Sequence, residues 1–581
     1  MYTYTDFDKH FVRQRAAQYR DQLDRHLAGR LPDDEFRALR LQNGWYVQRH
    51  APMLRVAVPY GELSATQLRG LARIARDYDR GYAHFTTRQN LQYNWIPLDK
   101  SAEVMDQLAA VDMHGIQTSG NCIRNITSDC FAGIAPDESV DPRPYGEIMR
   151  QWSTLHPEFA FLPRKFKIAV TGASEDRAAI GWHDIGLHLV KNEAGEIGFK
   201  VLVGGGMGRT PVIGTVFREF LPWQQILVFI EAVVRVYNRY GRRDNIYKAR
   251  IKILVKAEGQ RFVDDVNAEF KDILERDVDG TAHIIPQSEF DRVNASFVIP
   301  AGVAARPSTG IPMPADLPAS YGRWIQRNVH AHKLSGYRAV TLSLKRTGQA
   351  PGDITDAQME LAADLADRYS HGELRVSHDQ NLVLPWVLES DLPALWEAAR
   401  SASFATPNIG LLTDMIACPG GDFCALANAR SIPLAAEITE RYQDLDELWD
   451  IGDIDLHISG CINSCGHHHS GHIGILGVDK DGAEWYQLTL GGSDGSAISG
   501  GPLAGKVIGP SFAADEAADA IEAVIDTYLS QRQGSERFID TVKRVGLDPF
   551  KAATNAVRRT TARELPADTA SASASASASA D

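Results

Sequence analysis

The order of hydrophobic and polar residues predicts the same small unit twice. An alternating run typical of a strand begins at Met53, and a similar run begins at Arg338. A helical pattern follows each run, and Ser64 and Thr355 stand where an N-cap is expected. A second strand comes next, so each unit reads strand, helix, strand and is of the α+β type.

Short motifs repeat along the chain at a nearly constant spacing. Gln380 of one Gln-Asn-Leu segment follows Gln89 of the other by 291 residues. The other matching pairs keep this spacing to within about four residues: Gly172 and Gly460, His183 and His472, Gly205 and Gly492. We therefore predict two related halves of similar length, each with one small α+β unit and one larger mixed domain. The Pro-rich stretch 300–318 is the predicted linker between them.

The composition narrows the class of protein. The chain of 581 residues is 44% hydrophobic and 23% charged, as in globular proteins, and is long enough for several domains. A net charge of -13 argues against general nucleic-acid binding. Polar residues at the start and the absence of a long apolar run predict neither a signal peptide nor a membrane span. We expect the alternating Ser-Ala tail at 571–580 to be disordered.

Four cysteines carry the clearest chemical signal. They form a C-x5-C pair and a C-x3-C pair flanked by glycines: Cys418, Cys424, Cys461 and Cys465. Four thiolates are the ligand set of a cubane iron–sulfur cluster, one per iron. A zinc site, disulfides or unrelated thiols are the alternatives, although structural zinc usually takes cysteines two to four residues apart. Six cysteines in so long a chain do not make a disulfide framework, which favours a reducing cytoplasm.

The cysteine pairs and the repeat together resemble the sulfite/nitrite reductase family, from about Leu41 to about Tyr528. The resemblance implies a duplicated fold in which a siroheme and a [4Fe-4S] cluster lie at the pseudo-twofold interface. The implied segments are an N-terminal helical segment with the first ferredoxin-like half-domain, the first siroheme-binding domain, a linker, the second half-domain, the cluster domain and a C-terminal tail: 1–118, 119–300, 301–320, 321–405, 406–545 and 546–581.

The resemblance also implies residue roles. The four cysteines would bind the cluster, and Cys465 would in addition be the axial ligand of the siroheme iron. Further cofactor contacts would come from Arg124, the glycine loop and the second cysteine motif: Arg124, Gly204, Gly205, Gly206 and Asn463. Four cations match the positions that bind the substrate anion: Arg88, Arg143, Lys165 and Lys167. On a strand, Lys165 and Lys167 project to the same face.

Other residues of interest receive no catalytic role. Cys122 and Cys130 are predicted to be buried free thiols. Some relatives join a tyrosine to a cysteine near the site, and Tyr46 would be that tyrosine. The position five residues before Arg143 is Glu138, however, so no such bond is predicted. The run 467–469 of histidines is predicted to be a loop beside the cofactors rather than a metal site.

Substrate and electron donor complete the hypothesis. Lys167 favours sulfite, because nitrite reductases of this family typically carry Asn there; the alternative is a ferredoxin-dependent nitrite reductase. A non-catalytic iron–sulfur electron carrier is a second alternative. The repeats leave no room for a flavin or nicotinamide domain, so electrons are expected from a ferredoxin or a flavoprotein subunit. A candidate basic patch for this partner consists of five residues: Arg242, Arg243, Lys248, Arg250 and Lys252.

Overall fold

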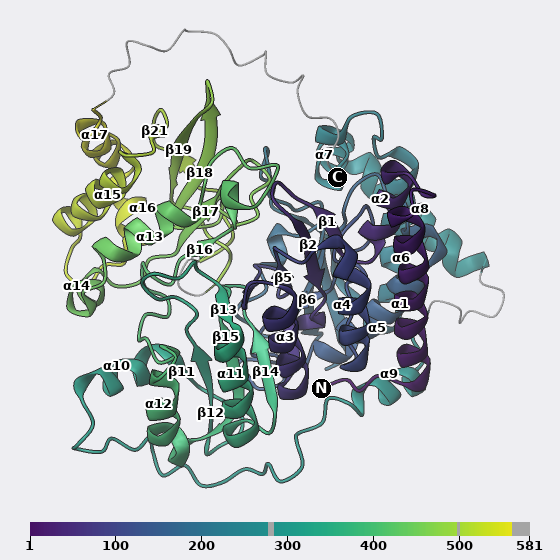
Figure 1. The fold of residues 1–581 in the computed structure, drawn as a ribbon, viewed down its shortest axis with the longest axis horizontal. Coiled ribbons are helices and arrows are strands. Elements are labelled where there is room, and N and C mark those ends of the chain that lie inside the picture. Colours follow the sequence, from purple (N-terminus) through teal and green to yellow (C-terminus); the bar gives the residue numbers. More distant parts are fainter. Residues whose placement is uncertain (277–283, 497–499, 560–581) are drawn as a thin grey trace. The chain divides into compact units, whose positions relative to one another are not determined.

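The computed structural model describes residues 1–276, 284–496 and 500–559, and it divides the chain into two compact units (Figure 1). Unit 1 comprises Met1–Ile409 with Asp494–Leu503, and unit 2 comprises Gly410–Ser493 with the chain from Ala504 onward. The short segment Asp494–Leu503 therefore belongs to unit 1 although its neighbours on both sides belong to unit 2. The predicted Ser-Ala tail lies outside the described residues.

Two related sheets in unit 1 exchange a strand. The first sheet has the order β1(Trp45–Val47), β2(Pro52–Val56), β5(Leu91–Tyr93), β4(Tyr82–Phe85), β13(Asp353–Thr355). The second has the order β11(Val329–His330), β12(Tyr337–Leu342), β15(Leu382–Leu388), β14(Glu373–Val376), β3(Glu62–Ser64). Strand β13 thus completes the sheet of the first half, and β3 completes the sheet of the second.

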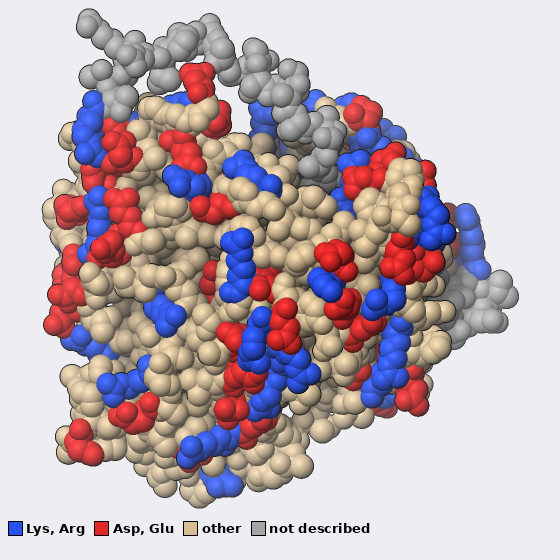
Figure 2. All heavy atoms as spheres, in the orientation of Figure 1, with Lys and Arg blue, Asp and Glu red and all other residues tan. Residues whose placement is uncertain are grey.

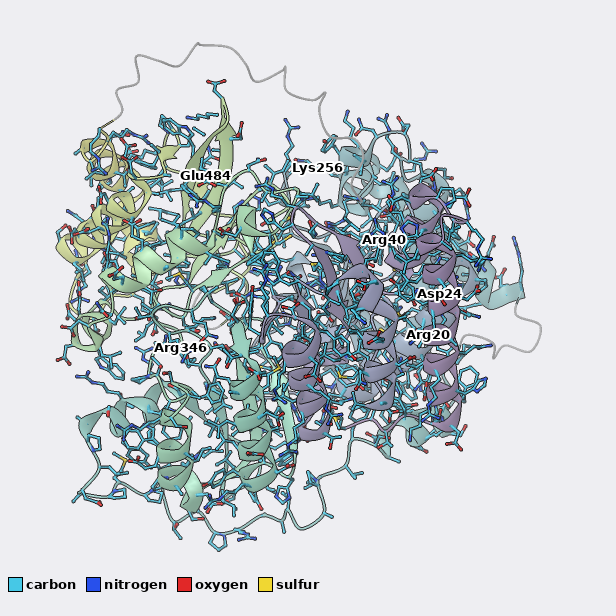
Figure 3. All side chains as sticks on the ribbon, viewed as in Figure 1. Arg20, Asp24, Arg40, Lys256, Arg346 and Glu484 are labelled. Atoms are coloured by element: carbon cyan, nitrogen blue, oxygen red, sulfur yellow. The ribbon has the colours of Figure 1, made fainter. Side chains whose placement is uncertain are left out.

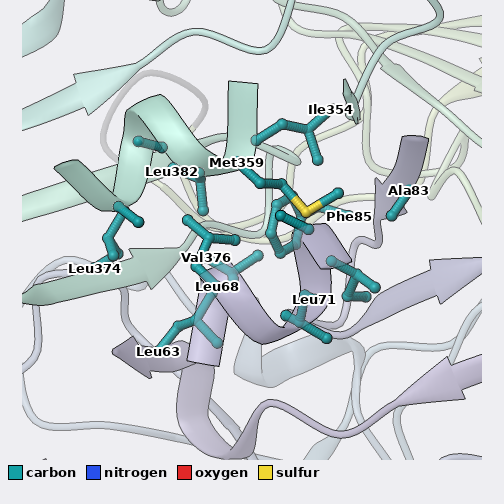
Figure 4. Packing of buried hydrophobic residues seen from close by; sticks show 14 of the residues in the cluster. Leu63, Leu68, Leu71, Ala83, Phe85, Ile354, Met359, Leu374, Val376 and Leu382 are labelled. Carbon is teal, nitrogen blue, oxygen red and sulfur yellow. The ribbon is translucent and has the colours of Figure 1, made fainter. Parts of the chain in front are cut away.

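Helices α3(Ala65–Tyr78) and α11(Asp356–Tyr369) follow the exchanged strands and lie side by side. Ser64 and Thr355 cap them through complete capping boxes, as the sequence predicts. Leucines and a methionine from both halves fill one continuous core beneath the helices (Figure 4). Removing this apolar surface from water is the main force that holds the two half-domains together.

The larger domain of unit 1 is built on another sheet. Its strands have the order β10(Thr215–Pro222), β9(Ile197–Val203), β8(Ile185–Lys191), β7(Ile168–Thr171), β6(Thr127–Ser128). Strands β6, β7 and β8 are parallel, and β9 and β10 continue antiparallel. The remaining helices of unit 1 are α1(Asp6–Leu27), α2(Asp33–Gln42), α4(Ser101–Ala110), α5(Arg143–Leu155), α6(Ile226–Tyr240), α7(Ile251–Glu258), α8(Gln260–Arg276), α9(Gln287–Asn294), α10(Ala319–Asn328) and α12(Leu392–Arg400).

Unit 2 repeats this sheet. Its strands have the order β16(Ile416–Ala417), β17(Leu456–Ser459), β18(Ile473–Lys480), β19(Ala483–Leu490), β20(Lys506–Val507), with β21(Phe512–Ala513) also on β19. Its helices are α13(Ile432–Arg441), α14(Leu445–Ile451), α15(Ala517–Gln531), α16(Phe538–Val545) and α17(Asp548–Ala556). Ile168 pairs with Ile185 in unit 1 and Leu456 pairs with Ile473 in unit 2, so both pairings are shifted by 288 residues. The structure confirms the duplicated α+β fold. Among the described residues, no helix is long and apolar enough to cross a membrane.

Candidate active site

The four cysteines of unit 2 lie on two neighbouring loops. Cys418 directly follows β16 and Cys461 lies just after the end of β17. Because β16 and β17 are parallel neighbours, their carboxyl ends open at the same edge of the sheet. The Cys418 N–H donates to the Ile458 carbonyl at 3.1 Å, and the Asn428 N–H donates to the Gly460 carbonyl at 2.8 Å. These main-chain bonds hold the two cysteine loops together.

The loops also shape the environment of the sulfur atoms. The Gly460 N–H donates to Cys418 Sγ at 3.2 Å, and the hydroxyl of Ser431 lies 3.5 Å from the same sulfur. Burial raises the pKa of Cys418, and burial together with the other three thiols raises the pKa of Cys461 to about 12. Without a metal these groups are therefore protonated, and the positive charge of iron is what would make them thiolates.

Glycines bring the backbone close to the cysteines. Gly420 has φ +60°, and a Cβ there would lie 2.4 Å from the Ser431 nitrogen. A Cβ on Gly460 would lie 2.6 Å from the Ala429 oxygen, and one on Gly466 only 1.9 Å from the Ile458 oxygen. No side chain fits at these positions, as expected for loops that close tightly around a bulky group. An ion pair also anchors the segment between the cysteine pairs to β19, since Arg430 lies 3.1 Å from Glu484. Glu484 is labelled in Figure 3.

The spacing of the thiols distinguishes between metals. All six cysteines lie within the described residues, and none of them forms a disulfide there. In the part of the chain that the structure describes, no three His, Cys, Asp or Glu side chains come close enough to share one metal ion. A structural zinc ion usually takes cysteines two to four residues apart, whereas a cubane needs one thiolate at each of four separate irons. The x5 spacing of Cys418 and Cys424 and the set of four cysteines fit an iron–sulfur cluster better than a structural zinc site.

In unit 1, Lys165 and Lys167 lie beside Arg124. Phe166 forms a parallel bridge with Ile123, and the Arg124 N–H donates to the Phe166 carbonyl at 2.8 Å. Ile123 and Phe166 are fully buried in the core. Because side chains alternate along extended chains, Arg124, Lys165 and Lys167 project to the opposite face. The structure thus brings two predicted substrate cations and one predicted cofactor cation to one surface.

Arg88 belongs to the same positive region. Its Nη2 donates to the Asn125 carbonyl at 2.7 Å, whereas its buried Nη1 has no hydrogen-bond partner among the described residues. Burial lowers the pKa of Arg88 to about 9, and the nearby charges of Arg124, Arg250 and Arg55 act in the same direction. A buried cation among other cations is costly unless an anion neutralises it. This orphaned guanidinium nitrogen therefore fits a bound anion.

Arg55 and Arg250 are further members of this region that the sequence reasoning did not single out as site residues. Arg55 donates to Gln92 Oε1 at 3.0 Å and to the Thr118 carbonyl at 3.5 Å. Arg124 donates to that same carbonyl at 2.7 Å. Arg55, Arg124 and Arg250 lie on different segments of the chain, and the bonds of Arg55 and Arg124 described here end on uncharged oxygens. Their gathering into one positive region is therefore visible only in the three-dimensional structure.

Asp184 is the carboxylate of this region. It accepts two bonds from Arg250 Nη2, at 2.8 and 2.9 Å, and one from the Lys167 N–H at 2.8 Å. Burial and the positive charges of Arg88 and Lys167 lower the pKa of His183 well below its usual value, so this histidine is neutral. Asp184 pairs closely with Arg250, and the basic side chains gathered around Arg88 and Arg124 outnumber this one carboxylate.

Arg143 lies in a different environment. Its guanidinium pairs with Glu62 at 2.6 Å and Asp141 at 2.7 Å, and Glu373 lies at 3.9 Å. Burial opposes its charge, but the carboxylates of Asp141 and Glu62 raise the pKa of Arg143 well above its usual value. Its charge is thus neutralised inside the protein. This geometry supports a structural role for Arg143, and its predicted contact with the substrate gains no support.

The predicted cofactor glycines form a supported loop. Gly204 has φ +85°, and its N–H donates to the Asp184 carbonyl at 2.9 Å. Gly206 has φ +154° and exchanges main-chain bonds with Val212. The buried ammonium of Lys252 donates to the carbonyls of Gly206, Met207 and Thr210 at 3.3, 2.6 and 2.5 Å. Gly205 allows no Cβ, since one would lie 2.4 Å from the Gly181 oxygen.

The remaining sequence predictions lie outside these two groups. Cys122 is half-buried and Cys130 is buried, and neither forms a disulfide. The Tyr46 hydroxyl donates to the Thr118 carbonyl at 3.4 Å. Glu138 accepts two bonds from the Gly133 N–H at 2.7 and 3.0 Å. His468 of the histidine run is buried, and the described residues provide no hydrogen-bond partner for either ring nitrogen.

Comparison with known proteins identifies the family. The model of the nitrite and sulphite reductase 4Fe-4S domain matches residues 119–273 and 411–559, and that of the nitrite/sulfite reductase ferredoxin-like half domain matches 46–111 and 334–402. These ranges cover most of the chain, which therefore belongs to the nitrite and sulfite reductase family of oxidoreductases. Membership implies a siroheme and a [4Fe-4S] cluster as cofactors.

Some relatives are named as nitrite reductases and others as sulfite reductases. An assimilatory ferredoxin-dependent nitrite reductase of Haloferax mediterranei is 29% identical and aligns over 85% of this chain and 82% of that protein. A ferredoxin sulfite reductase of Mycobacterium tuberculosis is 27% identical over 86% and 83%. The solved structure of the Mycobacterium tuberculosis NirA protein has a TM-score of 0.71 and 25% identity, covering 91% of this chain and 95% of that one.

Proposed function

We propose that this protein reduces sulfite to sulfide with electrons from a separate ferredoxin-type donor. The observation that carries the proposal is the gathering of basic side chains around Arg88, Arg124, Lys165 and Lys167. Two lysines that project together with Arg124 suit a compact oxyanion of high charge. Relatives named as ferredoxin sulfite reductases and ferredoxin nitrite reductases support the donor class, and Lys167 is the argument for sulfite over nitrite.

Residues of this chain can be assigned to each of the two cofactors. Cys418, Cys424, Cys461 and Cys465 would hold the cluster. Cys465 is the exposed member of the set, whereas the other three are buried or half-buried, which supports the proposal that its sulfur would also bind the siroheme iron. Arg124 and the glycine loop Gly204–Gly206 would meet siroheme carboxylates. Asn463 lies with its main-chain N–H directed at Cys461, which supports the cluster side of its predicted role.

The reaction sets the tasks of the side chains. Hydrogen sulfite plus six electrons and six protons gives hydrogen sulfide anion and three waters. When bound, siroheme and the cluster supply the electrons and the metal at which the oxyanion is reduced. Arg88 would bind the substrate oxygens through its guanidinium, whose buried Nη1 has no hydrogen-bond partner among the described residues, and would stabilise negative charge as each S–O bond breaks. Lys165 and Lys167 would hold the same anion and pass protons to the departing oxygens.

Turnover with reduced methyl viologen tests this proposal. The purified protein should reduce sulfite, and Lys167→Asn should shift the ratio of kcat/KM for sulfite over nitrite toward nitrite by about tenfold, the effect of one lost charge contact. Lys200→Asn, at a half-buried lysine paired with the exposed Glu219, is the matched control and should leave the ratio unchanged. A wild-type kcat/KM for nitrite above that for sulfite would overturn the assignment to sulfite and leave nitrite reduction as the function.

A further inference from the structure

Exposed aromatic and basic side chains gather on the surface of unit 1. Phe161 is 74% exposed and Tyr247 is 67% exposed, which is unusual for such large rings. Tyr240 and Ile246 are also exposed nearby in the sequence. We call this surface the aromatic–basic patch and define it by six residues: Phe161, Tyr240, Arg242, Arg243, Tyr247 and Lys248.

Hydrogen bonds hold the patch together. Arg243 Nη2 donates to the Phe161 carbonyl at 3.2 Å, and its Nη1 donates to the Asn238 carbonyl at 3.1 Å. The Arg243 guanidinium thus connects the segment before Lys165 with the end of α6. Asn245 caps the short 3-10 turn Ile246–Lys248 by accepting a bond from the Tyr247 N–H at 3.0 Å. The exposed rings therefore stand on a fixed backbone.

The patch has a local positive charge in an acidic chain. Arg243 donates to uncharged oxygens, Lys248 is exposed, and Arg242 pairs with Asp244 across a surface ion pair. The whole chain carries -13, and acidic and basic side chains are interspersed on the face drawn in Figure 2. The patch is therefore a local site of complementary charge for an acidic partner, in a chain that is acidic overall. Complementary charge steers association.

The position of the patch connects it with the site. Phe161 is four residues before Lys165, and Lys248 is two residues before Arg250, the partner of Asp184. The Tyr237 hydroxyl donates to the Ala249 carbonyl at 2.7 Å and fixes the second of these segments. Of the basic patch predicted from sequence, Arg250 and Lys252 thus turn inward to the site, while Arg242, Arg243 and Lys248 remain on the surface.

We propose that the aromatic–basic patch is the docking surface for a small acidic iron–sulfur protein that delivers the electrons. Exposed apolar area rimmed by charge marks interaction sites. Aromatic residues and arginine are the types that dominate the energy of protein interfaces. A carrier bound to the patch would lie against the segment that leads to the predicted substrate cation Lys165 and the segment that leads to Arg250. This inference rests on the proposed function, since only a reductase of this kind needs such a donor.

The experiment compares two electron sources. Arg243→Glu and Tyr247→Ser are measured with a purified acidic [2Fe-2S] ferredoxin kept reduced, and separately with reduced methyl viologen, which needs no docking. Arg261→Glu on α8, an exposed arginine 3.5 Å from Glu258, is the matched control. We expect the KM for ferredoxin to rise about tenfold in Arg243→Glu and to lose its salt dependence, as for a lost charge contact at an interface. Methyl viologen rates should stay at the wild-type value.

Several outcomes would overturn the inference. An unchanged KM for ferredoxin in both patch variants would do so, and so would an equal rise in the control. If a second copy of this chain occupied the patch instead of a carrier, Tyr247→Ser would change the oligomeric state. Sedimentation of the wild type and this variant measures that state. A wild type that fails with methyl viologen would refute the proposed function instead. In that case, titration of ferredoxin binding still tests whether the patch is the docking surface. Loss of binding in Arg243→Glu, with binding retained in the control Arg261→Glu, would support it.

Discussion

The two larger domains share a backbone but differ in what occupies the loop after the central strand. By the shift of 288 residues, the position of Cys465 in unit 2 corresponds to Arg177 in unit 1. Arg177 pairs with Asp129 at 2.8 Å, Asp137 at 2.9 Å and Glu175 at 2.7 Å. The strand pairings also show that Asp129 in unit 1 is the structural equivalent of Cys418 in unit 2. In unit 1, internal ion pairs hold this loop. In unit 2, thiols occupy the equivalent positions and are available to bind a metal.

A second difference concerns the residues before the central strand. Lys167 of unit 1 corresponds to Asp455 of unit 2, and the main-chain N–H of each bonds a buried side chain, Asp184 in one copy and His472 in the other. The backbone interaction is retained while the side-chain charge is reversed. The two copies thus share a scaffold, and on the proposed function each would have its own ligand chemistry: anion binding in unit 1 and cluster binding in unit 2.

The largest effect is expected from removing a cluster ligand. Cys418→Ser should abolish cluster assembly, because three thiolates and a protonated hydroxyl cannot complete the set, and activity should be lost. Iron and acid-labile sulfide content of the purified protein measure the result. Cys122→Ala, at a half-buried thiol that donates to the Ser119 carbonyl, is the control and should retain full iron content. Full iron content in Cys418→Ser would contradict the assignment of the cluster to unit 2.

The next largest effect separates Arg88 from Arg143. Arg88→Met should lower kcat/KM about 10²- to 10³-fold with the melting temperature unchanged, as for the loss of a group that stabilises transition-state charge. Arg143→Met should instead lower the melting temperature, because Glu62 and Asp141 lose their partner in the interior. Methyl viologen assays and thermal unfolding, with siroheme content as a check on loading, measure both. The reverse pattern would restore Arg143 to the substrate site.

Arg177→Met tests the ion pairs that replace the cluster. Asp129 would be left buried and unpaired, so unfolding of unit 1 should be easier by about 3–5 kcal/mol while iron content stays normal. Thermal unfolding followed by near-UV circular dichroism detects the change. Arg276→Met removes an exposed pair with Asp272 and should cost at most about 1 kcal/mol. Equal effects of the two variants would show that the buried pairs are not what holds this loop.

The smallest expected effect concerns Lys252. Burial lowers the pKa of Lys252 to about 8, below its usual 10.5, so its ammonium is charged below pH 8 and neutral above it. Siroheme uptake by the apo-protein should therefore weaken by about tenfold as pH rises from 7 to 9, one charge-assisted contact being lost. Lys252→Met should bind weakly at both pH values. Titration followed by siroheme absorbance gives the profile, and a pH-dependent Lys252→Met would assign the effect to another group.

Sequence reasoning reached the parts of the structure that depend on local patterns. The capping boxes at Ser64 and Thr355, the repeat and the cysteine loops were predictable because each is encoded in a few adjacent residues. The exchange of β3 and β13 was not, since three-residue strands carry no information on a partner almost 300 residues away. The different partners of Arg124 and Arg143 were also hidden, because a motif specifies charge but not which carboxylates the fold brings beside it.

The exchanged strands have a consequence for synthesis of the chain. The His84 imidazole contacts Asp353 of β13, a separation of 269 residues. During translation the first half-domain therefore exposes the open edge of its sheet until most of unit 1 has left the ribosome. Unpaired edges and distant contacts slow folding and favour aggregation. Expression of this protein should accordingly depend on chaperones that bind nascent chains, and a truncated chain that ends before Asp353 should be insoluble.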